Sequence, residues 1–143
     1  MKKNTIAKVT IWLSLLLFGI SLTQTCIIID FREIVEIPSF DYFLMGSTAI
    51  IGGAISEWFV WLANPLSLLT IILLAANKRL AIITGLIALF LAGSFRSWKE
   101  ILGAESGSMA KIISFELGYY LWILSIAILS LGTFIHFLKK NKP

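Results

Sequence analysis

The sequence predicts an all-α integral membrane protein, a four-transmembrane-helix bundle with both termini in the cytoplasm. Three observations predict it. Of the 143 residues, 58% are hydrophobic and only 14% are charged, whereas soluble domains average about 45–50% and about 25%. The hydrophobic residues fall into blocks near the length of about 20 residues that crosses a bilayer. The basic residues concentrate on the side that would hold both termini. No room remains for a sizeable soluble domain, so residues 1–143 are expected to form a single transmembrane domain.

The first span is predicted over residues 9–29. Its basic start and apolar run resemble a secretory signal, but Thr23, Gln24 and Thr25 lack the small side chains that a signal peptidase prefers. We therefore expect an uncleaved helix that contains Cys26 as a small apolar residue. Because this is the only cysteine, the chain can form no internal disulfide and no two-thiol site.

The second span follows an outer loop that we place over residues 30–55. In that loop, the alternation of residues 30–42 favours an extended, strand-like segment, which Pro38 restricts to an edge or a turn. The apolar block of residues 43–76 would measure about 51 Å as one helix, far more than the hydrocarbon core of about 30 Å. We therefore predict one crossing, residues 56–76.

The extra apolar segment before this crossing, residues 43–55, has three possible placements. It forms an outward helical extension, lies in the membrane interface, or is partly re-entrant and buried in protein. Its glycines, Gly46, Gly52 and Gly53, permit a break or a close helix contact.

The third and fourth spans are predicted over residues 80–95 and 117–138. Only residues 77–79 join the second span to the third, so these two helices should form an antiparallel hairpin. The second outer loop, residues 96–116, begins like a short turn of helix. Its glycines and serines then indicate a flexible loop.

The charges predict the orientation. With both termini on one side, eight of the twelve basic residues lie there, close to helix ends, which makes that side cytoplasmic by the positive-inside rule. All eight acidic residues fall on the other side or at its border. The net charge is then +8 inside and 4 − 8 = −4 outside, which sums to the formal +4. The basic character thus reflects topology, and we expect lipid but no nucleic acid as a partner.

Aromatic residues agree with this orientation. Trp and Tyr favour the membrane interface because an apolar ring there carries one polar group that needs water. Six such residues are expected as interface anchors at the outer ends of the second, third and fourth helices: Trp58, Trp61, Trp98, Tyr119, Tyr120 and Trp122.

Small residues mark two predicted packing faces, because helices in lipid associate by close approach of their backbones. The face on the third helix comprises Ala81, Gly85, Ala88 and Ala92. The face on the fourth helix comprises Gly118, Ser125 and Gly132. These faces contact another helix, either within the chain or in an oligomer.

The candidate site is Glu57 with Asn64 and Pro65, where the second span carries polar residues. Glu57 lies near the outer interface, where an acid at a helix end is common and cheaper than at the membrane centre. Pro65 frees the carbonyl of Trp61 and kinks the helix, and Asn64 either bonds that carbonyl or reaches a neighbouring helix. A kink is the commoner explanation, although transporters also build midway binding sites from unwound helix.

The sequence contains no phosphate-binding, zinc-protease or serine-hydrolase motif, so we expect no enzyme, no cofactor and no metal. The leading hypothesis is a non-catalytic accessory, assembly or regulatory subunit of the bacterial inner membrane, with a membrane-protein partner or a homo-oligomer. One alternative is a small oligomeric transporter or channel that uses Glu57 and the Asn64-Pro65 kink. A second is a lipid enzyme that uses Glu57 with Glu116 or His136.

Overall fold

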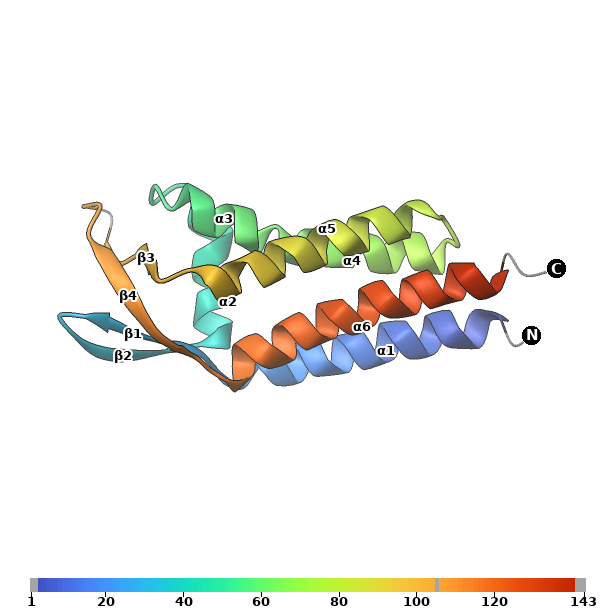
Figure 1. Cartoon of the computed structure of the whole chain (residues 1–143), viewed down its shortest axis with the longest axis horizontal. Coiled ribbons are helices and arrows are strands. Elements are labelled where there is room, and N and C mark those ends of the chain that lie inside the picture. The colour runs from blue at the N-terminus through green and yellow to red at the C-terminus, as the bar shows by residue number, and fades with distance from the viewer. Residues whose placement is uncertain (1–2, 105, 141–143) are drawn as a thin grey trace.

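The chain folds into a long helical bundle with a small β-sheet at one end. A computed structural model describes residues 3–104 and 106–140. Both termini and the α4–α5 turn lie at the opposite end from the sheet (Figure 1). We call these two ends the sheet end and the terminal end. The expectation of an all-α fold is therefore wrong for the sheet end, where four antiparallel strands form.

Four helical stretches are long and apolar enough to cross a membrane: Thr5–Leu22, Ile55–Ala75, Leu80–Ser97 and Leu117–Lys140. They correspond to α1 (Lys3–Leu22), α3 (Ile55–Trp61) with α4 (Ala63–Ala75), α5 (Leu80–Ser94) with the 3₁₀ turn η1 (Phe95–Ser97), and α6 (Leu117–Lys140). The remaining elements are α2 (Ser39–Thr48), β1 (Thr25–Phe31), β2 (Glu33–Pro38), β3 (Glu100–Leu102) and β4 (Met109–Phe115).

The first helix ends seven residues before the end of the predicted span of residues 9–29. Its last turn closes through hydrogen bonds from the N–H groups of Thr23 and Gln24 to carbonyls of α1. The isoleucines that follow are β-branched and favour a strand over a helix. Cys26 is therefore a buried strand residue, not the helix residue that we expected.

The sheet joins segments that are far apart in the sequence. Its order is β2-β1-β4-β3, so β1 pairs with its neighbour β2 and also with the distant β4. Ile27 lies opposite Ile37 on one side and opposite Phe115 on the other. Its side chain is fully buried in a core that also includes Ile101 and Phe95. The predicted flexible loop of residues 96–116 is thus largely η1 and a β3–β4 hairpin, with Gly107 at the turn in the left-handed region at φ 86°.

The predicted strand-like segment within residues 30–42 is the edge strand β2, and Pro38 is its last residue, as expected. The rest of the predicted outer loop of residues 30–55 is not a loop, because Ser39–Thr48 forms α2. A turn with Gly53 at φ 85° then leads into α3. The extra apolar segment is therefore mainly the second half of a short helix followed by a reversal of the chain.

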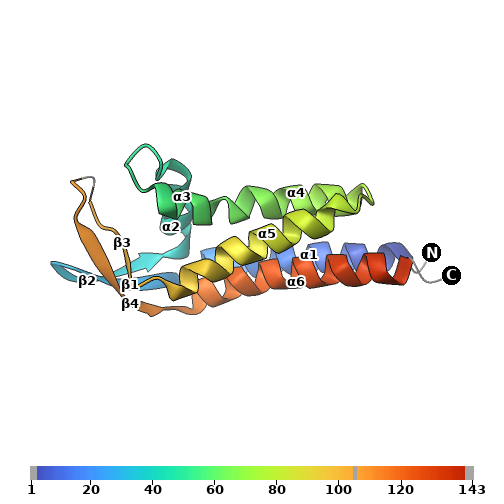
Figure 2. The same ribbon diagram turned by 45° about the horizontal axis from the view of Figure 1, so that its top comes forward.

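The helices form two pairs. α1 runs alongside α6, and α4 runs alongside α5 (Figure 1). α5 leans across the bundle, so that it lies beside α4 at the terminal end and approaches α6 toward the sheet end (Figure 2).

The small residues lie at these crossings. The buried ones on α5 are Ala81, Gly85, Ala88 and Ala92. A Cβ atom on Gly85 would lie 3.2 Å from the Ser130 hydroxyl of α6. On α6, Gly132 packs against Thr10 of α1, and Gly118 packs against Ser39 and the Thr25 carbonyl. Ser125 is also buried.

Hydroxyl groups link the helices at several levels. The hydroxyls of Thr70 and Thr84 lie 2.8 Å apart between α4 and α5. Ser130 of α6 donates to the Gly85 carbonyl at 2.8 Å. Tyr119 is buried and donates to the Ala92 carbonyl at 3.2 Å. In an apolar bundle such bonds hold the helices in one register.

Candidate functional site

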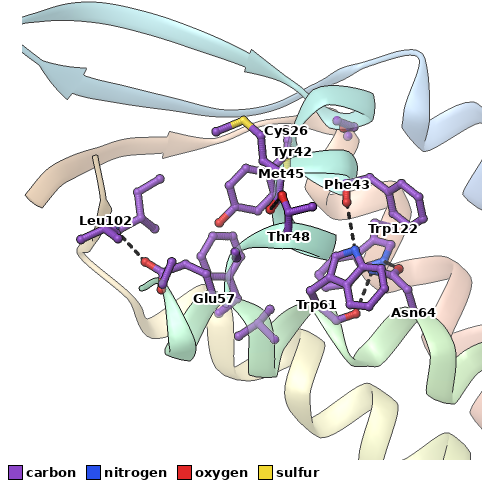
Figure 3. Close-up of a pocket in the computed structure, with 18 of the residues that line it drawn as sticks. Cys26, Tyr42, Phe43, Met45, Thr48, Glu57, Trp61, Asn64, Leu102 and Trp122 are labelled. Atoms are coloured by element: carbon purple, nitrogen blue, oxygen red, sulfur yellow. Dashed lines mark hydrogen bonds between the residues drawn. The ribbon is translucent and has the colours of Figure 1, made fainter. Parts of the chain in front are cut away.

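A cavity of about 410 Å³ lies at the sheet end, where α2 and α3 cover the ends of the main helices. Its volume falls within the range of about 300–1,000 Å³ that is usual for small-molecule sites. Side chains from α1, α2, α3, α6 and the β3 hairpin line it, as the close-up shows (Figure 3). Most of the lining is apolar, and a few polar groups are placed among aromatic rings.

Glu57, which we predicted as a site residue, is one of these polar groups. Its Oε1 accepts a hydrogen bond of 2.7 Å from the backbone N–H of Leu102, which ties α3 to β3. The side chain is half-buried, and it forms no ion pair with any residue that the structure describes. Glu57 is thus oriented by the protein backbone while its charge stays unpaired.

Tyr42 of α2 presents a second polar group to the cavity. Its ring stacks on Phe95 with centroids 5.7 Å apart. Its hydroxyl makes no hydrogen bond within the described parts of the chain, and it lies on the same side of the cavity as the Glu57 carboxylate (Figure 3). Burial raises the pKa of Tyr42 well above its ordinary value, and Cys26 and Glu57 act in the same direction. Tyr42 therefore stays protonated and able to donate.

Ser39 and Cys26 also line the cavity, and both are buried. The Ser39 hydroxyl is buried, and no described group forms a hydrogen bond with it. Burial raises the pKa of the Cys26 thiol to about 12, and the neighbouring Ser39 hydroxyl offsets this only in part. The thiol is consequently neutral and behaves as a small apolar wall.

Asn64 and Pro65 mark the point where the second span is broken. The helix is interrupted at Leu62, between α3 and α4. Asn64 Nδ2 donates to the Trp61 carbonyl at 3.0 Å, which replaces the bond that Pro65 cannot make. The Asn64 carbonyl oxygen accepts from Trp122 Nε1 of α6 at 2.8 Å. Asn64 therefore makes both of the contacts that the sequence allowed for.

A second cavity of about 320 Å³ lies on the terminal side of the first, between α1, α4 and α6. It is almost entirely apolar, and Pro65, Leu68 and Ile71 of α4 form one wall. The two cavities share five lining residues: Phe18, Phe43, Trp61, Asn64 and Trp122. Trp61 is fixed within this shared wall, because its Nε1 donates to the Phe43 carbonyl at 2.9 Å.

The predicted interface anchors all belong to elements of the sheet end or to the turns of α6 nearest to it. Several of them are engaged inside the protein. Trp61 and Trp122 line the cavities, and Trp98 packs edge-on against Phe95 with ring centroids 5.3 Å apart. By contrast, the other residues of the lipid-enzyme alternative lie outside both cavities: Glu116 accepts from the Ser114 hydroxyl, and His136 faces Asn77 at the terminal end, 3.3 Å away.

No feature of the sequence identified Tyr42, Ser39 or the Leu102 N–H as parts of a site. They reach the cavity only because the sheet and α2 fold back over the helices. Comparison of the chain with family models, with curated proteins and with solved structures finds no match. The geometry of the site is therefore the basis for its function.

Proposed function

We propose that this is a small multi-pass protein of the bacterial inner membrane that acts as a non-catalytic accessory, assembly or regulatory subunit. Four helical stretches of suitable length and hydropathy support a membrane location. The predicted cytoplasmic side would be the terminal end, where both termini and the basic turn at Lys78 and Arg79 lie (Figure 1). The sheet end would then face outward and be available to a partner.

The observation that carries the proposal is the free edge of β2. This strand has a neighbour on one side only, because it is the outermost strand of the sheet. Four successive residues, 33–36, are exposed, and Ile34 has an exposed fraction of 72%. A free edge with unpaired backbone groups binds extended segments by strand addition. Glu33 and Glu36 flank the two apolar side chains, so the matching segment would carry basic residues.

The small-residue faces, in contrast, are occupied within the chain. Gly85 meets Ser130, and Gly132 meets Thr10. These faces hold α1, α5 and α6 together and leave no small-residue stripe for a partner helix. We therefore assign partner recognition to the outward sheet, and the proposed occupant is an extended, basic segment of another membrane protein.

Purification from native membranes in a mild detergent tests this proposal. The wild-type protein should retain a stoichiometric membrane-protein partner, and Ile34→Lys should lose it by placing a positive charge opposite a basic segment. Ile51→Lys is the matched control, because Ile51 is 86% exposed in the turn after α2 but lies outside the sheet. A wild-type protein that is recovered alone, or equal retention by both variants, would overturn the proposal.

A small oligomeric transporter or channel is the second candidate, and the shared wall between the two cavities favours it. The cavities follow one another along α3 and α4, past Glu57 and the Asn64-Pro65 break. Reconstitution into liposomes with Glu57→Gln as the comparison decides this. Flux by the wild-type protein that the variant lacks supports transport, and the absence of flux for every ion tested removes it.

A further inference from the structure

We infer that the two cavities form one binding site for an amphiphile with an ammonium-type cationic end and a hydrocarbon chain. The inference starts from the charge of the first cavity. Among the residues that the structure describes, Glu57 is the only acidic residue that lines it, and no described Lys, Arg or His does. A half-buried carboxylate without an ion pair among the described residues leaves a negative charge on the cavity wall, which favours a cationic ligand over an anionic one. An anionic headgroup would be repelled.

The fixed geometry of Glu57 supports a bound cation. Because the Leu102 N–H holds Oε1, the carboxylate is already oriented before a ligand arrives. The second oxygen, Oε2, makes no hydrogen bond to any described residue. A preorganised acceptor binds an ammonium group without the entropic cost of ordering a free side chain.

Aromatic rings and hydroxyl oxygens complete the polar end of the site. Tyr42, Phe43, Phe95 and Trp61 line the same cavity, and the faces of such rings attract ammonium groups. Tyr42 and Ser39 line the cavity, the Ser39 hydroxyl has no partner among the described residues, and both hydroxyl oxygens can accept a hydrogen bond from an ammonium N–H. A bare metal ion fits poorly, because Ca²⁺ needs six to eight oxygen ligands and the described residues contain no cluster of three metal-ligating side chains.

The second cavity accounts for the hydrocarbon chain. It begins at the shared aromatic wall and continues toward the terminal end beside Leu68 and Ile71. Most of its lining surface is apolar, and the hydroxyls of Ser67 and Ser125 already donate to carbonyls of their own helices, which suits an alkyl chain better than a fully polar ligand. A molecule with its head at Glu57 and its chain beside α4 would occupy both volumes.

The test uses the full chain in neutral maltoside micelles, titrated calorimetrically with dodecyltrimethylammonium. Saturable binding at one site per chain is expected, and Glu57→Gln should weaken it about tenfold or more, because the variant keeps an acceptor for Leu102 but loses the charge. Dodecanoate, with a chain of similar length and an anionic head, should show no saturable binding. Equal binding of the two amphiphiles, or no effect of Glu57→Gln, would overturn the inference.

A second variant tests where the hydrocarbon chain of the ligand binds, and it remains informative if Glu57→Gln fails to fold. Ser67 lines only the second cavity, so Ser67→Leu should fill the space for the chain. It should weaken binding of the dodecyl probe while leaving binding of a hexyl probe unchanged, and equal effects on both probes would contradict the placement of the hydrocarbon chain.

Competition distinguishes the source of the natural ligand. Displacement of the probe by an amine-headed phospholipid, but not by an anionic one, identifies membrane lipid, whereas its failure to compete identifies a free amphiphile.

Discussion

Asn64 shows how one side chain holds a broken helix and its neighbour together. Its amide N–H satisfies the Trp61 carbonyl, and its amide oxygen satisfies the Trp122 indole. The sequence pointed to this position because Asn-Pro inside an apolar span is unusual. It could not reveal that the partner across the bundle is Trp122, 58 residues later.

Replacing Asn64 by Ala should destabilise the protein by about 1–3 kcal/mol, because the half-buried Trp122 indole N–H and the freed Trp61 carbonyl both lose their partners. Thermal unfolding in detergent should show a lower midpoint. Ser67→Ala is the control, since Ser67 bonds only to the Ala63 carbonyl of its own helix. If the two variants have equal midpoints, Asn64 does not link the helices.

Cys26 allows a prediction about pH. Its folded-state pKa of about 12 lies above the ordinary value of 9.0. Between these two pH values the folded protein keeps the thiol proton, whereas the unfolded chain loses it. The free energy of unfolding is therefore unaffected by this group below about pH 9, and it falls as the pH rises toward about 12. At about pH 8, iodoacetamide should leave the thiol of the folded protein unmodified, because the thiolate is the nucleophile. Modification should be rapid after denaturation in dodecyl sulfate. Equal rates in both states would show that the thiol is not buried.

The sheet is the element that sequence reasoning missed. Ile27–Ile29 resume an apolar run after the polar residues 23–25, and so short a run suits the end of a helix as well as a strand. In β4 hydrophobicity does not alternate along the sequence, because Met109 and Ile113 are apolar yet exposed, beside the buried Ala110 and Ile112. The glycines and serines before it indicated flexibility, although they form the hairpin turn. Only the pairing of β1 with β4 shows that both segments are strands, and these two strands are far apart in the sequence.

The α1–α6 contact should be sensitive to side-chain size at Gly132. A Cβ atom there would collide with Thr10 of α1. Gly132→Ala should therefore cost about 1–3 kcal/mol through overpacking and lower the thermal midpoint. Gly19→Ala offers a matched control on α1, because nothing lies within 4 Å of its added Cβ. A midpoint for Gly132→Ala as high as that of Gly19→Ala would contradict the close approach of the two helices.

At the scale of the whole molecule, the four apolar segments and the common side of both termini were predictable. Both follow from long-range averages of composition and charge, which do not depend on local conformation. The cavity was not predictable, because its walls come from segments between α1 and α6 that meet only in the folded chain.

The proposed orientation can be tested by cysteine accessibility, since the native Cys26 is buried. A membrane-impermeant maleimide added to intact spheroplasts should label Ser106→Cys, in the exposed β3–β4 turn, and not Lys78→Cys, in the exposed α4–α5 turn. After permeabilisation both should react. The reverse pattern on intact spheroplasts would place the termini outside.

The pairing of β1 with β4 also has a consequence for synthesis. β1 leaves the ribosome more than half a chain length before β4. At roughly 5–20 residues per second, it waits several seconds with one edge of its backbone unpaired. Until the segment that carries β4 has been synthesised, the β1–β2 hairpin is a two-stranded ribbon, which is only marginally stable in water. In the orientation proposed above, translocation of that segment is therefore the step that completes the sheet end, which matures last.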